Sequence, residues 1–312
     1  MDKPLTQMPG MPSPQNTGGA DNPLKKYYRQ PAIYITLPSK GKYYDAQTFT
    51  PTETGEIPIL PMTAKDEMTL KTPDALINGQ ATVDVIESCV PNIKNAWRVV
   101  NHDLDSLLLA IRIATYGETM NLTGTVPNTT ETIEHTVNLP AMLDHVARLE
   151  IKDEFTTAGG FYIRIKPLDY KKLTDTQITA FEKQKQYVAM SSRQDIPEVE
   201  RGRMFAENFK QLTKMNFDIL HDAVIEIRTP DGTTVSDKTQ ITEFLDNAPK
   251  KIVEEIQIGL SENRSQASLP PVKLKATEQQ IKKGAPANYE LPLTFDSANF
   301  FVQRYCQRTT TT

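Results

Sequence analysis

The residues that could carry chemistry are few and widely spaced along this chain. Its four histidines are scattered: His102, His135, His145 and His221. None of them stands at a metal-ligand spacing from another histidine, a cysteine or a carboxylate on one helix face. The two cysteines, Cys89 and Cys306, suggest neither a disulfide framework nor a metal knuckle, and we expect Cys89 to be a small buried residue. The sequence therefore predicts no bound metal and no cofactor.

Motifs for phosphate binding and nucleophilic catalysis are also missing from the sequence. The glycine pairs Gly18-Gly19 and Gly159-Gly160 are isolated, and no Gly-Lys-Thr/Ser motif follows a predicted strand. Glu254 and Glu255 are adjacent on a predicted helix, so their carboxylates do not face each other. These observations favour a protein that is not an enzyme. An enzyme whose site assembles from distant residues remains an alternative.

Arg112 is the most unusual charged residue, because it interrupts the longest apolar helix of the chain. Leucines and isoleucines cover most of this helix, and only Asp105 and Arg112 clearly break the apolar surface before Gly117 ends it. A helix that is apolar nearly all round is expected at the centre of a domain. We therefore interpret Arg112 as a buried structural charge, held by an internal salt bridge or with its head group reaching water.

The helices that organise the chain are predicted between Leu60 and Gly117. Thr63 and Asp66 form a start that is similar to a capping box. Thr72-Pro73 is a second helix start, with proline at the first helical position. A third helix is indicated by apolar residues at helical spacing: Val83, Ile86 and Val90. Short helices therefore lead directly into the long apolar one.

Outside this segment, short strands alternate with helices. Alternating apolar and polar residues predict strands at 34–37, 57–60, 122–126, 133–139, 161–165, 223–229, 272–274 and 289–295. Because these strands are hairpin-like and half polar, they favour an α+β fold over a doubly wound sheet. The expected fold has a central helical core, small antiparallel β-hairpins and an extended N-terminal arm.

An antiparallel helix pair is predicted between residues 168 and 215. Phe181 belongs to the apolar face of the first helix and Phe209 to that of the second, and a short polar loop at 191–195 joins them. Aromatic residues at helical spacing are typical of a core. We therefore expect both phenylalanines to be buried.

Length and composition limit the partners of the chain. It has 312 residues, a formal net charge of -4, 38% hydrophobic residues and 24% charged residues. The mild acidity of the chain argues against binding to nucleic acids or membrane surfaces, because both attract proteins that present a concentrated basic face. No apolar run is long enough to span a bilayer, and no apolar signal segment begins the sequence. We expect the protein to be made and used in a cytosol or in an assembly built there.

Four regions are predicted along the chain. Residues 1–30, rich in proline, glycine and polar residues, form an extended arm that partners would order. Residues 31–167 form the helical core with a hairpin, and residues 168–303 form the helix pair and a second β-hairpin region. Residues 304–312 form a tail.

The order of these pieces resembles the baseplate hub and baseplate assembly subunits of contractile-tailed phages of the T-even type. The resemblance covers residues 34 to about 303. The stretches that carry it are Leu37-Pro38-Ser39-Lys40-Gly41 with Tyr43, residues 61–67, residues 73–79, residues 112–117 and residues 295–301. The second, third and fourth of these stretches are the more specific ones.

This resemblance implies a structural subunit in the hub or inner part of a tail baseplate, acting through protein interfaces. The alternative is an assembly chaperone that leaves the finished particle, and a peptidoglycan hydrolase carried at a tail tip is a third possibility. The implied partners are other baseplate and tail proteins, such as hub, wedge, tube or sheath-proximal subunits, with several copies in a symmetric virion. We expect the interface to include these residues: Leu37, Pro38, Ser39, Gly41, Tyr43, Phe300 and Phe301.

The resemblance also implies cysteine pairs on two hairpins, similar to zinc-ribbon knuckles. The corresponding places in this chain are Thr125 to Asn128 and Leu274 to Ala285, and neither contains a cysteine. If the hairpins form without metal, cross-strand pairs and packing must hold them.

Overall fold

The structure, a computed structural model, describes residues 22–72, 78–191, 198–266 and 268–292. These residues fall into two compact units, one within residues 1–30 and one from residue 31 onward. In the first unit, the short 3-10 helix η1 (Pro23–Tyr27) begins at Asn22, whose side chain accepts a hydrogen bond from the N–H of Leu24. The remaining elements belong to the second unit.

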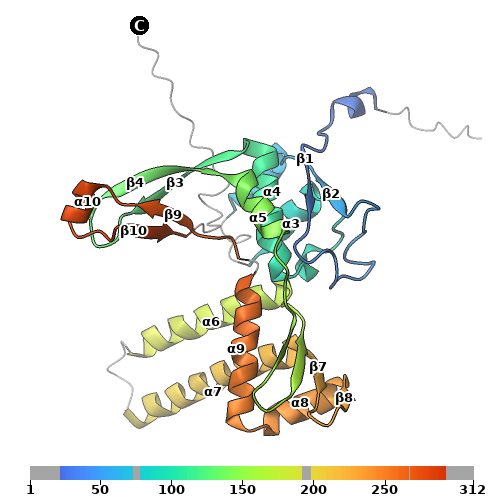
Figure 1. Cartoon of the computed structure of the whole chain (residues 1–312), viewed down its shortest axis with the longest axis vertical. Coiled ribbons are helices and arrows are strands. Elements are labelled where there is room, and N and C mark those ends of the chain that lie inside the picture. Colours follow the sequence, from blue (N-terminus) through green and yellow to red (C-terminus); the bar gives the residue numbers. More distant parts are fainter. Residues whose placement is uncertain (1–21, 73–77, 192–197, 267, 293–312) are drawn as a thin grey trace, which may run out of the picture. The chain divides into compact units, whose positions relative to one another are not determined.

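Helices and small antiparallel sheets alternate along the second unit (Figure 1). Its elements up to residue 147 are β1 (Ile33–Thr36), β2 (Glu56–Ile59), α1 (Ala64–Leu70), α3 (Gln80–Cys89), η2 (Ala96–Arg98), α4 (Asn101–Tyr116), β3 (Thr119–Thr125), β4 (Thr132–Asn138) and α5 (Leu139–Ala147). The later elements are β5 (Glu154–Thr156), β6 (Tyr162–Ile165), α6 (Tyr170–Ser191), α7 (Glu198–Ala223), β7 (Val224–Arg228), β8 (Thr234–Val235), α8 (Lys238–Asn247), α9 (Lys250–Gln266), β9 (Val272–Lys275), α10 (Glu278–Lys282) and β10 (Asn288–Leu291). The fold is α+β, as the sequence predicts.

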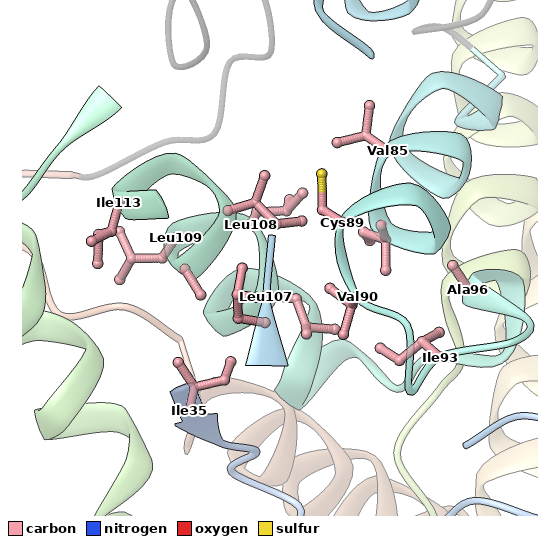
Figure 2. Close-up of a cluster of buried hydrophobic side chains, with 14 of the residues drawn as sticks. Ile35, Val85, Cys89, Val90, Ile93, Ala96, Leu107, Leu108, Leu109 and Ile113 are labelled. Carbon is pink, nitrogen blue, oxygen red and sulfur yellow. The ribbon is translucent and has the colours of Figure 1, made fainter. Parts of the chain in front are cut away.

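The long helix α4 lies inside the largest hydrophobic core. It packs against α3, α5, α6 and α9 and against the β1–β2 hairpin, which explains why it is apolar on nearly every face. Figure 2 shows side chains from α3, α4 and β1 in this core, with Cys89 among them. Cys89 is a fully buried thiol, so its predicted role as a small buried residue is confirmed.

Local signals set the ends of the helices around this core. The hydroxyl of Thr63 accepts a hydrogen bond from the N–H of Asp66, and the Asp66 carboxylate accepts one from the N–H of Thr63. This is the capping box that the sequence predicts. Gly117 ends α4 with a φ of 94°, a conformation that glycine adopts without a steric penalty. The helix start predicted at Pro73 lies outside the described residues.

A second core lies on the four-stranded sheet, whose strand order is β5-β6-β7-β8. Every neighbouring pair in this sheet is antiparallel, and β6 pairs with β7 from Tyr162 opposite Arg228 to Ile165 opposite Val224. Apolar residues from α7, α8 and α9 cover the sheet. Because β6 precedes residue 167 and β7 follows it, hydrogen bonds of one sheet cross the boundary predicted at that residue.

Two further hairpins, β3–β4 and β9–β10, pack on each other through a third and smaller core (Figure 1). Along β3 and β4, apolar and polar residues alternate, and the polar ones other than His135 are exposed. The short helix α10 lies between β9 and β10, where the sequence pattern predicted no helix. Its capping box joins Thr277 and Gln280.

Candidate functional site

The turn after β1 is a compact structure held by its own backbone. The N–H of Lys40 donates to the carbonyl of Leu37 at 2.9 Å, and the N–H of Lys42 donates to that of Ser39 at 3.1 Å. Lys40 and Gly41 both have positive φ values, 52° and 76°, and a Cβ on Gly41 would approach the Phe49 ring to 3.0 Å. The turn therefore depends on glycine at position 41.

Asp103, in the first turn of α4, fixes this turn to the central core. Its carboxylate accepts hydrogen bonds from the N–H of Ser39 at 2.8 Å, from the Ser39 hydroxyl, and from the Tyr44 hydroxyl at 2.6 Å. Burial raises the pKa of Asp103, and the three hydrogen bonds oppose that rise by stabilising the charged form. The position near the N-terminus of α4 also favours a negative charge. A buried carboxylate with three donors acts here as a structural clamp.

The hydrogen bonds to Asp103 determine which residues of the turn are exposed to solvent. Leu37, Pro38 and Ser39 are buried within the chain, so their side chains hold the turn in place. Of the interface residues predicted here, Gly41 and Tyr43 are half-buried, and the flanking lysines Lys40 and Lys42 are exposed. The surface that the turn offers to a partner is therefore formed by residues 40–43.

A second connection joins this turn to the segment before β5. The ammonium group of Lys42 lies 2.6 Å from Asp153 Oδ2, and the Tyr43 hydroxyl donates to the same oxygen at 3.3 Å. Burial, followed by the negative charge of Asp153, raises the pKa of Tyr43. Tyr43 thus stays a neutral hydrogen-bond donor in this cluster.

His102, beside Asp103, connects α4 to α9. Its Nε2 atom lies 2.8 Å from the carbonyl oxygen of Asn263, and the Asn263 side chain donates to the carbonyl of Lys152 at 2.7 Å. Burial lowers the pKa of His102, so the neutral ring is favoured. This histidine fixes the packing of two helices. The sequence does not indicate this role, because the partner of His102 is far along the chain.

Arg112 lies on α4 and is buried, with only 6% of its surface exposed. Its guanidinium carbon lies 4.6 Å from the centre of the Tyr116 ring, and the Tyr116 hydroxyl donates to Glu67 Oε1 at 3.0 Å. Burial lowers the pKa of Arg112. A cation over an aromatic ring is a favourable contact when it is shielded from water. Arg112 and Tyr116 both lie on α4, and the hydrogen bond from Tyr116 to Glu67 connects this pair to α1.

The two places that correspond to cysteine-bearing knuckles do face each other in the structure. The Asn128 side chain donates to the carbonyl of Gly284 at 3.4 Å, and Glu131 accepts from Gln280 at 2.7 Å. Between them lies an apolar cluster formed by Val126, Ala285, Tyr289 and Leu291. No group of three or more His, Cys, Asp or Glu residues that could hold a metal occurs among the described residues. The side chains at this place do not fit a zinc site.

Gly124 shows how closely these two hairpins pack. A Cβ atom at this position would lie 2.6 Å from Leu291 Cδ2, closer than real contacts allow. We expect Gly124→Ala to lower the free energy of unfolding by roughly 1 kcal/mol, through overpacking. Urea denaturation measures the loss. In the double variant Gly124→Ala/Leu291→Ala the two losses should be less than additive, because the second change removes the clash. Full additivity would show that the hairpins do not pack in this way.

Comparison with known proteins identifies the family of the chain. The family model described as "T4 bacteriophage base plate protein" matches residues 31–283, which is well over half of the chain. The chain belongs to this family. No curated protein matches it, and no solved structure does. The T-even-type resemblance inferred from the sequence is therefore confirmed, and the family is one of structural baseplate proteins.

The match to the base plate family covers the clamped turn, the α4 core, the four-stranded sheet and the β3–β4 hairpin, and it ends before β10. Phe300 and Phe301, which were predicted as interface residues, lie beyond the matched range and outside the described residues. In the described part of the chain, no helix has the length and hydropathy that a membrane span requires.

The helix pair α6–α7, inside the matched range, exposes apolar residues whose helical spacing predicted a core. Phe181 is 65% exposed and Phe209 is 73% exposed, so the prediction that both are buried is wrong. Other large apolar residues are exposed on the same two helices: Val188, Val199 and Met204. The periodicity identified the apolar faces correctly, but it gave no information on how far each helix extends beyond the cores that could cover it.

Proposed function

We propose that this protein is a structural subunit of the hub or inner part of a contractile-tail baseplate, retained in the virion in several copies and acting through protein interfaces. The observation that carries the proposal is the exposed apolar surface of α6 and α7, which is formed by Phe181, Val188, Val199, Met204 and Phe209. Exposed apolar patches on a folded protein mark sites of association. The family supports partners among other baseplate proteins.

A second contact in this proposal is formed by residues 40–43, the exposed part of the clamped turn. Asp103 holds the backbone of this turn, so little conformational entropy is lost when a partner binds it. Phe300 and Phe301 complete the proposed interface as a segment near the end of the sequence.

The composition of purified particles tests the proposal. We expect quantitative mass spectrometry of virions to find this protein in a fixed ratio to other baseplate proteins. Its absence from virions, together with its presence in assembly intermediates, would instead identify an assembly chaperone.

The apolar surface can be tested by substitution. We expect Phe181→Ser/Phe209→Ser to reduce incorporation into particles at least tenfold, because both side chains become buried from water when the interface forms. Thermal unfolding of the purified variant should be nearly unchanged, since neither side chain is buried in the free chain. Met68→Ser, which removes an exposed apolar side chain from α1, is the matched control. Equal incorporation of the double variant and the wild type would contradict a role of α6–α7 in assembly.

A further inference from the structure

A cavity of about 280 Å³ lies where α7 and α9 meet the start of α4 and the segment before α6. Its lining is mixed in chemistry. Leu168, Ile219 and Leu220 contribute apolar surface, whereas its polar residues are mostly amides: Asn101, Asn216, Gln257, Ser261, Asn263 and Arg264. The cavity belongs to neither the clamped turn nor the apolar surface of α6–α7.

The base of this cavity is fixed by the surrounding structure. Leu220 is only 1% exposed and belongs to the core of the four-stranded sheet. The N–H of Asn101 donates to the carbonyl of Leu168 at 2.9 Å, which joins two sides of the wall. Asn263 is held on both sides, by His102 at its carbonyl and by Lys152 at its amide. The cavity is therefore preformed and does not need a partner to organise it.

The rim of the cavity carries polar groups that the chain itself does not use. Among the described residues, the side chains of Asn216, Gln257 and Ser261 make no hydrogen bond, and Arg264 makes no ion pair. Cations nearby behave differently, since Lys172 and Lys238 both pair with Asp222, at 2.7 and 2.9 Å. Within the described structure, the guanidinium group of Arg264 is thus available to an external anion.

These groups define the chemistry of a ligand. An amide side chain both donates and accepts hydrogen bonds, as the main chain of a peptide does. A guanidinium group prefers a carboxylate, which it can bind with two parallel hydrogen bonds. The apolar wall suits an aliphatic side chain. The volume lies just below the roughly 300 Å³ at which ligand pockets begin, so a nucleotide or another large cofactor does not fit.

We propose that this cavity binds a short extended segment of another baseplate protein, in which an aspartate or glutamate stands next to an aliphatic residue. The carboxylate pairs with Arg264, the main chain bonds to Asn216 and Gln257, and the aliphatic side chain contacts Leu168 and Leu220. This inference rests on the proposed function, in that the chain works through protein interfaces.

Photo-cross-linking in infected cells tests the proposal with the protein in its natural setting. Benzoylphenylalanine is placed at position 216, on the rim, and mass spectrometry identifies the residues that it captures. We expect cross-links to another baseplate protein, at a segment with an aspartate or glutamate within a few residues. Arg264→Glu should lower the cross-link yield about tenfold, and Arg264→Lys should retain most of it. Arg148→Glu, a charge reversal at an exposed position directly after α5, is the matched control and should change nothing.

Cross-links confined to the chain itself, an absence of cross-links, or capture of a segment without a carboxylate would each overturn the proposal. The captured segment then provides a synthetic peptide for fluorescence anisotropy with the purified full chain. Replacing its acidic residue by the amide should weaken binding about tenfold in the wild type and leave binding to Arg264→Ala unchanged. Equal weakening in both proteins would also overturn the pairing. Particle composition, which tests the proposed function, is measured independently of this binding.

Discussion

Replacing Asp103 with alanine should lower the free energy of unfolding by about 3–5 kcal/mol, the largest loss that we expect from a single substitution in this chain. The carboxylate accepts three hydrogen bonds, two buried ones from Ser39 and a partly buried one from Tyr44. Alanine leaves these donors buried without their acceptor, and each such donor costs about 1–3 kcal/mol. Denaturant unfolding of the purified chain measures the effect.

Smaller substitutions at the same clamp provide the controls. Tyr44→Phe removes one donor and one acceptor, since the Tyr44 hydroxyl also accepts from the N–H of Val100 at 3.1 Å. We expect it to cost about 1–2 kcal/mol, clearly less than Asp103→Ala. Hydrogen exchange should report faster opening of residues 37–44 in Asp103→Ala, with α5 unaffected. A loss below about 1 kcal/mol in Asp103→Ala would show that the carboxylate does not hold the turn.

The sequence predicted those features of the fold that depend on neighbouring residues. The capping box of Thr63 and Asp66 joins positions three residues apart, and Gly117 ends α4 at the position where the apolar pattern stops. The strands of β3–β4 follow from the alternation of polar and apolar side chains. In each case the physical cause acts within one turn or one hairpin, so periodicity and residue type identify it.

Features that join distant segments could not be predicted in this way. Ser39 and Asp103 are 64 residues apart, and His102 and Asn263 are 161 residues apart. Sequence patterns describe which face of an element is apolar, but they do not describe which element covers it. The same limit explains Phe181 and Phe209, whose faces were identified correctly and whose exposure was not. The cavity beside Arg264 was missed as well, because four separate segments of the chain form it.

These distant contacts have a common consequence for function. Polar contacts fix the turn, α4 and α9 to one another, through buried Asp103, through exposed Lys42 with buried Asp153, and through buried His102 with Asn263. Satisfied buried polar networks stabilise one specific packing. The surfaces proposed for association therefore belong to a rigid structure, which lowers the entropic cost of binding at each of them.

Asp105→Asn should stabilise the chain at pH 8 by about 2–3 kcal/mol, the opposite of the effect expected at its neighbour Asp103. In the described part of the structure, Asp105 makes no hydrogen bond or ion pair. Burial raises its pKa to about 6. In the unfolded chain an aspartate has a pKa of about 3.9. The folded state thus binds a proton more tightly, so the stability contributed by Asp105 is complete below pH 4 and is lost as the pH rises through 6.

An asparagine at position 105 carries no charge at either pH and removes this dependence. The difference in unfolding free energy between Asp105→Asn and the wild type should therefore be large at pH 8 and close to zero at pH 4. Asp144→Asn, which changes an exposed aspartate on α5, is the control and should stay within about 0.5 kcal/mol of the wild type at both pH values. A difference for Asp105→Asn that does not change with pH would mean that its carboxylate is solvated or paired in the folded chain. The contrast with Asp103 then has a simple physical basis, because the two carboxylates stand on the same buried helix and only one of them has donors.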